Sequence, residues 1–226
     1  MRSKKDSLDI EHISSVMGKE LKDTSPETLK LFDFAIQSIQ KRISYCKYHL
    51  SEFNTHSTPV ALLKDRLDPQ TDDELSIRIL YEANAFGFIS NLHALVDSLP
   101  FILNIIFNTR EIDNTGIGWN PRFINGYRDF TFFSQLENFQ KNNLFVKLKG
   151  LTNTSKHKYL TRLKNDFKKI SFESISYREK KEEKLIADVD AEQFMIDSYN
   201  TLIPELIWTI NLIIEAKKNS RTETLR

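Results

Sequence analysis

The amino-acid sequence predicts an all-α protein, an up-and-down helical bundle with a small β-hairpin before the last helix. Apolar residues recur at spacings of three and four over long stretches, which is the period of a helix with one buried face. Glycine and proline are scarce, at six each in 226 residues, so long helices are favoured over a loop-rich sandwich. One stretch between 165 and 189 follows the two-residue period of a strand instead.

The first long helix is expected to begin at Pro26 and to run to about residue 51. Ser25 precedes it as a favourable N-cap, and proline suits the first position of a helix. A shorter helical piece is expected before it, at about 8–21. The region 54–72 contains two prolines and is expected to be broken.

The longest helical pattern opens with "TDDEL", whose Thr71 or Asp72 suits an N-cap and whose acids suit a helix N-terminus. From 75 to 107 apolar residues occur nearly all round, as expected of a helix surrounded by others. Pro100 should kink this helix or divide it in two. A loop is expected in "NTREIDNTGIGWNPRF". Further helices are expected at about 128–140, 144–159 and 190–218, the last bent at Pro204.

The alternating stretch "KKISFESISYREKKEEKLIADV" predicts a β-hairpin with strands near 168–177 and 183–188. No internal repeat or low-complexity linker divides the chain. We therefore expect one helical domain over 1–226, with a core of about 26–160 and 190–218 and the hairpin at about 165–189.

Composition restricts the protein class further. Cys46 is the only cysteine, which excludes an internal disulfide framework and a cysteine-rich zinc site. The start of the sequence lacks the apolar segment of a signal peptide, so we expect a cytoplasmic protein. The apolar runs at 99–107 and 202–214 are each shorter than the about 20 residues that span a bilayer, so we expect no membrane association.

Positive charge is concentrated in one part of the chain. The whole chain carries a formal charge of +1, but the run 141–169 has nine Lys and Arg against one Asp, an excess of nine minus one, or +8. Such a run attracts phosphates without regard to nucleic-acid sequence, although a solvated surface has the same composition. The residues proposed for RNA binding are Lys147, Lys149, Lys158 and Arg162.

Within this run, "LTNTSKHKYL" places Asn153, Lys156 and His157 at the end of a helix. Asn153 and His157 are four apart and share one helix surface. A histidine exchanges a proton near neutral pH, a cation beside it stabilises charge on a phosphate, and an amide orients the oxygens. This set suits metal-free RNA cleavage by the 2′-hydroxyl. The alternative is a solvated helix end whose histidine interacts favourably with the helix dipole.

A second cluster, His93 and Asp97, lies four residues apart in the long apolar helix. These residues are candidates to support the site from an adjacent helix, and the alternative is a buried pair that orients helix packing. The sequence lacks the other familiar signatures: paired cysteines, a His-x-x-x-His or Glu-x-x-His pair, a Gly-rich phosphate loop and a Gly-x-Ser-x-Gly elbow. We therefore expect neither a metal nor another cofactor.

The long helix with "SNLHALVDSLPFILN", the loop after it and the helix ending in "NTSKHKYL" resemble the HEPN superfamily over residues 70–160. More narrowly, the chain is similar to bacterial HEPN-like proteins with an Asn-x-x-Lys-His signature. His157 matches the histidine of the usual HEPN signature, an Arg followed after four to six residues by His. The positions of that Arg hold Gly150, Leu151 and Thr152, and the nearest cations are Lys149 and Lys156.

The resemblance implies a helical bundle that forms a homodimer. It also implies an RNA-directed role in antiviral defence or toxin–antitoxin systems, with RNA and a protein partner or antitoxin as candidate partners. We expect a metal-independent endoribonuclease in which His157 is the general acid/base. The alternative is a catalytically inactive helical module that dimerises and binds a protein or nucleic acid. The sequence leaves both functions open.

Overall fold

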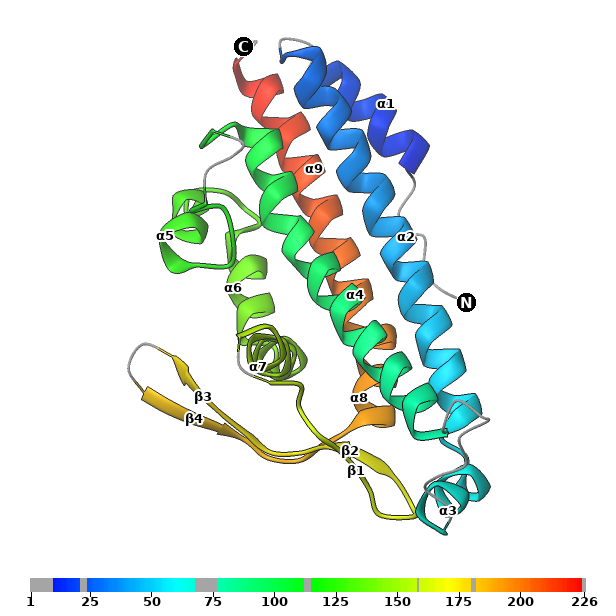
Figure 1. Cartoon of the computed structure of the whole chain (residues 1–226). Coiled ribbons are helices and arrows are strands. Elements are labelled where there is room, and N and C mark those ends of the chain that lie inside the picture. The colour runs from blue at the N-terminus through cyan, green and yellow to red at the C-terminus, as the bar shows by residue number, and fades with distance from the viewer. Residues whose placement is uncertain are drawn as a thin grey trace. The chain divides into compact units, whose positions relative to one another are not determined.

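The protein is mostly helical with a small β-region, as Figure 1 shows for the computed structural model. The structure describes residues 10–20, 24–67, 77–111, 115–157, 159–179 and 182–224. Its helices are α1 (Ile10–Glu20), α2 (Pro26–His56), α3 (Pro59–Leu67), α4 (Ile77–Phe107), α5 (Pro121–Ile124), α6 (Phe133–Lys141), α7 (Asn143–His157), α8 (Ala191–Asp197) and α9 (Ile203–Thr224), with a 3₁₀ turn at Asn125–Tyr127 and a π-helical turn at Ser198–Leu202.

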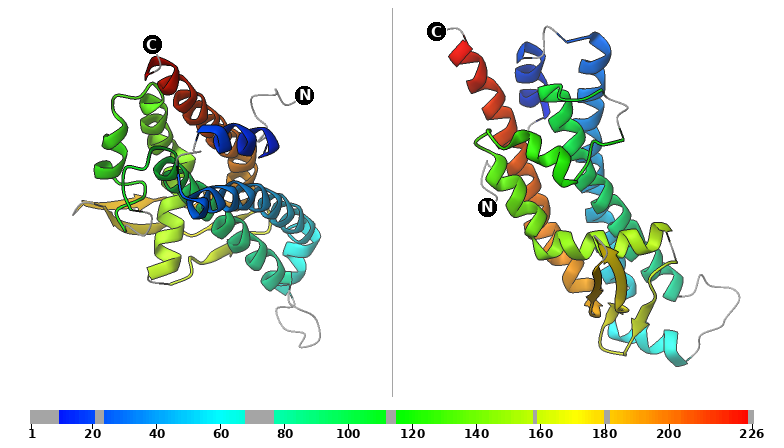
Figure 2. Two further views of the ribbon diagram at one scale, coloured as in Figure 1. Left: turned by 90° about the horizontal axis from the view of Figure 1, so that it is seen from above. Right: turned by 90° about the vertical axis from the view of Figure 1, so that its left-hand side faces the viewer.

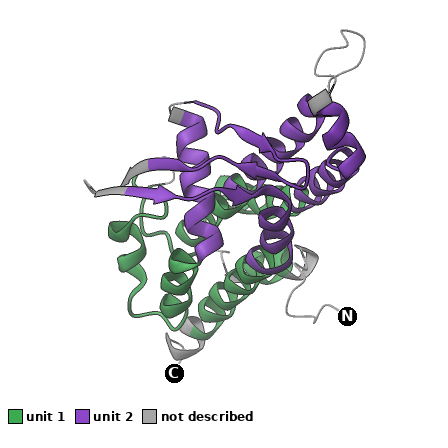
Figure 3. Cartoon of the chain, turned by 90° about the horizontal axis from the view of Figure 1, so that it is seen from below, with its two compact units in different colours: residues 1–42, 94–142, 203–226 green, residues 43–93, 143–202 purple. Residues whose placement is uncertain are grey.

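The chain falls into two compact units, coloured separately in Figure 3. Unit 1 contains residues 1–42, 94–142 and 203–226, and unit 2 contains residues 43–93 and 143–202. Helices α2 and α4 each contribute residues to both units. The prediction of a single domain over the whole chain stays a prediction.

Unit 1 is built from helices that bury apolar side chains. Residues Phe32, Ile36 and Ile39 of α2 follow the predicted helical spacing, and all three are buried. An aromatic cluster gathers at the end of α4, where the ring of Phe107 lies 4.5 Å from that of Phe130 between ring centroids. The Ser25 side chain accepts a hydrogen bond from the Thr28 N–H at 3.2 Å, so the predicted N-cap of α2 is confirmed.

Pro100 and Pro204, both in unit 1, differ in their effect on the helices. Helix α4 runs through Pro100 without division, contrary to one of the two outcomes predicted. Proline lacks an N–H, so the carbonyl of Val96, four residues earlier, loses its helical partner. The indole N–H of Trp119 donates to that carbonyl at 3.0 Å. The predicted last helix is instead interrupted just before Pro204, where a π-helical turn at Ser198–Leu202 separates α8 from α9.

Unit 2 combines helices with short strands, and Figure 2 shows the strands beside α7. Strands β1, β2 and β5 form an antiparallel sheet in the order β1-β2-β5, and β3 pairs with β4 in a separate hairpin. Their bounds are β1 (Leu163–Asn165), β2 (Ile170–Phe172), β3 (Ile175–Glu179), β4 (Glu182–Ile186) and β5 (Val189–Asp190).

This region contains a three-stranded sheet and a separate hairpin, whereas a single hairpin was predicted. The expected strand at 168–177 is divided at Glu173 and Ser174, which leave the ladder. The backbone N–H of Ser174 donates to the Asp188 carboxylate at 2.8 Å, and that of Glu173 donates to the Arg162 carbonyl at 2.8 Å. The bond from Ser174 to the Asp188 side chain takes a backbone N–H that strand pairing would otherwise use, and the expected strand is divided there into β2 and β3.

Three expected helix boundaries also needed correction. Region 54–72 is not simply broken, because α2 continues to His56 and α3 follows at Pro59, with the Thr58 hydroxyl capping it. The helix expected at 128–140 begins only at Phe133. Helix α7 ends at His157, two residues before the predicted end. The proposed cap in "TDDEL" lies outside the described residues.

Among the described helices, α4 is the one that is long and apolar enough to cross a membrane by length and composition. About two thirds of its most apolar window, 67%, is buried within the fold. Burial of this extent is compatible with the core helix of a soluble protein.

Candidate functional site

Helix α7 presents the residues of the Asn-x-x-Lys-His signature. Its buried side chains, Leu148 and Leu151 among them, anchor one side of the helix, while Asn153 and Lys156 are exposed. His157 is the last residue of the helix. The side chain of His157 and the whole of Lys158 lie outside the described part of the chain.

The structure brings two of the predicted site residues together although they lie 63 positions apart in the sequence. The ammonium nitrogen of Lys156, Nζ, is 3.1 Å from Nδ1 of His93 on α4. An ammonium group can only donate, so Nδ1 of a neutral His93 accepts and its proton sits on Nε2. His93 thus serves as an anchor for Lys156.

His93 and Asp97 do not form the buried pair considered as an alternative. His93 is half-buried, and Asp97 is exposed.

The lysines in the first half of the basic run are less exposed to a phosphate ligand than their number in the sequence indicates. Lys147 and Lys149 are half-buried, and Nζ of Lys149 lies 5.7 Å from the centre of the Phe145 ring. Gly150 is buried, so the backbone there is not open to a ligand.

The second half of the run forms the β1–β2 hairpin, where acidic residues distant in sequence take up charge. Nζ of Lys164 lies 3.3 Å from both the Glu173 and the Asp188 carboxylates, and its hydrogen bonds to them raise its pKa. The backbone N–H groups of Lys169 and Lys168 donate to Asp166 and lower the pKa of that carboxyl. Asp166 is already counted in the local excess of +8, and the carboxylates of Glu173 and Asp188 reduce that excess further in the folded chain.

Arg162 differs from these cations. Its side chain is exposed, and no carboxylate or carbonyl pairs with its guanidinium in the part of the chain that the structure describes. It lines a pocket together with Arg78 and Asp65, two residues that sequence reasoning missed. Their positions, about a hundred residues before β1, carry no motif that points to them.

The described residues contain no group of three His, Cys, Asp or Glu side chains that could hold a metal ion. Comparisons with protein families, with curated proteins and with solved structures find no match to this chain.

Proposed function

We propose that this chain is a HEPN-like, RNA-directed protein of bacterial defence or toxin type, and that it is a metal-independent endoribonuclease. The observation that carries the proposal is the 3.1 Å contact between Lys156 and His93. It holds a cation at the exposed end of the helix whose last residue is His157. A cation held beside a residue able to exchange a proton is the minimum that phosphodiester cleavage by a 2′-hydroxyl requires.

In the proposed reaction, the 2′-oxygen of RNA attacks the adjacent phosphorus and the bond to the 5′-oxygen breaks. His157 takes the proton of the 2′-hydroxyl, and water supplies the proton that the leaving 5′-oxygen needs. Lys156 stabilises the negative charge of the pentavalent phosphate, and Asn153 donates to its oxygens. The products are a 2′,3′-cyclic phosphate and a 5′-hydroxyl. His93 acts as a positioning residue that holds the Lys156 ammonium.

The test incubates purified protein with mixed cellular RNA in excess chelator. The parent protein is expected to cleave RNA and leave 2′,3′-cyclic phosphate ends. His157→Ala should lose about 100-fold or more in rate, because general acid–base catalysis contributes about that much. His56→Ala, at the end of α2, is the matched control and should cleave at the parent rate. Equal cleavage by parent and His157→Ala would contradict the assignment.

The role of His93 has a separate readout. In His93→Ala the ammonium of Lys156 loses its anchor, so cleavage should slow about tenfold. In His93→Gln an amide oxygen can accept from Lys156 and restore part of the rate. If His93→Ala cleaves as fast as the parent, the contact with Lys156 does not serve cleavage.

A second candidate function is a non-catalytic module that dimerises or binds a protein partner. It is favoured by the exposure of Tyr45 and Tyr48 on α2, at 52% and 58%. Tyrosines enriched at a surface are typical of protein interfaces. If parent protein leaves RNA intact but forms a dimer that Tyr45→Ser and Tyr48→Ser together dissociate, this function replaces the first. Light scattering on purified protein measures the dimer.

A further inference from the structure

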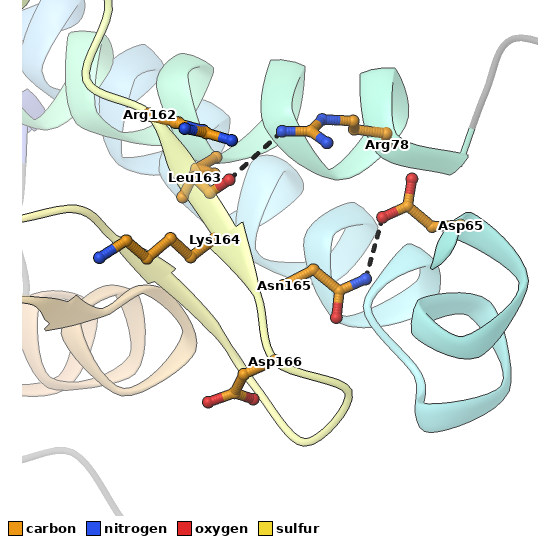
Figure 4. Close-up of a pocket in the computed structure, with 7 residues that line it drawn as sticks. All are labelled: Asp65, Arg78, Arg162, Leu163, Lys164, Asn165 and Asp166. Carbon is orange, nitrogen blue, oxygen red and sulfur yellow. Dashed lines mark hydrogen bonds between the residues drawn. The ribbon is translucent and has the colours of Figure 1, made fainter. Parts of the chain in front are cut away.

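A pocket of about 550 Å³ opens in unit 2 beside strand β1. A volume of this order suits a small molecule of nucleotide size. Figure 4 shows the seven residues that line it, which come from α3, from the first turn of α4 and from β1 and its flanks. The lining residues are Asp65, Arg78, Arg162, Leu163, Lys164, Asn165 and Asp166.

The two arginines of the pocket point toward one another, as Figure 4 shows. Arg78 donates through Nε to Glu82 at 2.9 Å and through Nη2 to the Leu163 carbonyl at 3.4 Å. These bonds fix its guanidinium and use two of its five N–H groups. Two guanidinium groups that face each other repel, and an anion between them removes that repulsion.

Arg162 is the second half of this arrangement. No described carboxylate pairs with its guanidinium, whereas Lys164 is held by two carboxylates in the same hairpin. Of the cations that line the pocket, Arg162 is therefore the one whose charge is least neutralised by neighbouring carboxylates. A guanidinium binds two oxygens of a phosphate at once, which an ammonium cannot do.

Asp65 supplies an acceptor to the same pocket. Its Oδ2 accepts from the Tyr81 hydroxyl at 3.1 Å and from Asn165 Nδ2 at 2.9 Å. Burial, followed by the Asp65 carboxylate, raises the pKa of Tyr81 well above its usual range, so the phenol keeps its proton and donates. Within the described structure no hydrogen bond to Oδ1 of Asp65 is present, so this oxygen can accept from a donor on a ligand in the pocket.

We propose that this pocket binds a phosphate monoester of nucleotide size, with Arg78 and Arg162 on the phosphate and Asp65 accepting from a sugar hydroxyl. The negative phosphate complements the paired guanidinium groups, and the sugar hydroxyl can donate to Oδ1 of Asp65. The same chemistry is present in a free mononucleotide and at the 5′-phosphorylated end of an RNA strand. The site does not depend on RNA cleavage and stands whether or not the chain is a ribonuclease.

Isothermal titration calorimetry on the full chain tests the site with adenosine 5′-monophosphate. The parent protein is expected to bind it at least tenfold more tightly than adenosine, which lacks the phosphate. Arg162→Ala and Arg78→Ala should each weaken binding at least tenfold, and Arg162→Lys should weaken it less than Arg162→Ala. Arg122→Ala, an exposed arginine of α5, is the matched control and should bind as the parent does.

A second pair of probes distinguishes the two sources of the phosphate. A short oligoribonucleotide is titrated with and without a 5′-phosphate, and the phosphate should improve its binding at least tenfold if an RNA end is the ligand. Binding of the mononucleotide with no gain from the 5′-phosphate identifies the free nucleotide. The proposal is overturned if neither phosphate probe binds, or if both bind Arg162→Ala and Arg78→Ala as tightly as the parent. Thermal unfolding of each variant confirms that it is folded.

Discussion

Polar side chains have different surroundings in the two units. In unit 1, Asn104 accepts from the Arg110 N–H at 3.0 Å, and the Glu205 carboxylate accepts from Gln135 and Asn142 at 3.1 and 2.7 Å. Each of these bonds joins segments of the fold. In unit 2, Lys156 and Arg162 lie at the surface, where the Lys156 ammonium is 3.1 Å from Nδ1 of His93 and Arg162 lines a pocket. The residues of both proposed sites therefore lie in unit 2, whereas these bonds of unit 1 hold its own segments together.

The largest loss of stability is expected from a substitution at Gly87, which packs closely against His49 within unit 2. A Cβ at Gly87 would lie 2.5 Å from the nearest His49 ring atom, and that ring holds a 3.0 Å hydrogen bond to Asn84. Gly87→Ala should therefore lower the free energy of unfolding by about 3 kcal/mol, through overpacking and loss of that bond. Denaturant unfolding measures the loss.

Two further variants control this experiment. Gly126→Ala in unit 1 meets no atom within 4 Å and should change stability little. In Gly87→Ala combined with His49→Ala, the missing ring makes room, so the combined loss should be smaller than the sum of the single losses. Additive losses would show that His49 is not what excludes a side chain at Gly87.

The second prediction concerns Trp119 in unit 1. Trp119→Phe keeps the aromatic ring that stacks on Phe139 at 5.2 Å but removes the N–H that serves the Val96 carbonyl. A carbonyl left without a partner costs about 1–3 kcal/mol, and we expect a loss of about 2 kcal/mol in the free energy of unfolding. Binding of adenosine 5′-monophosphate to the folded variant should equal that of the parent. A stability-neutral variant that binds the nucleotide more weakly would break the distinction between the units.

The smallest effect is expected at Asp188 on the surface of unit 2. The Ser174 N–H and then Lys164 lower the pKa of this carboxyl from 3.8. A carboxyl with a lowered pKa stabilises the fold fully above pH 3.8, and the contribution is lost as pH falls through the folded-state pKa. Asp188→Asn should therefore melt slightly below the parent at pH 6, and the difference between the two melting temperatures should shrink as the pH falls through the folded-state pKa of Asp188. A constant difference between the melting temperatures at all pH values would show that charge is not the cause.

Local periodicity was enough to predict much of the helical structure. The three- and four-residue spacing predicted α2, α4 and α7, and Ser25 was identified as a cap, because these signals act between near neighbours in sequence. Local periodicity could not predict contacts between residues that are distant in sequence. The bond from Trp119 to the carbonyl that Pro100 leaves without a helical partner is one example, and the bond from Ser174 to Asp188 that divides a predicted strand is another.

The candidate site shows the same limit. The sequence identified Lys156 and His93 as candidates from their local patterns, but only the structure shows their 3.1 Å contact. Charge counting treated Lys164 and Arg162 alike, although carboxylates from Glu173 and Asp188 hold the first and not the second. Arg78 has no distinctive local pattern, and its relevance comes only from its place beside Arg162 in the pocket.

The interleaving of the two units has a consequence for protein engineering. Residues 94–142 of unit 1 lie in sequence between the two segments of unit 2. No terminal truncation can therefore yield a fragment that holds all of unit 2 and nothing of unit 1. Fragment complementation offers a better approach, with the chain cut in a loop and both pieces expressed together, because each piece then meets the segments it needs.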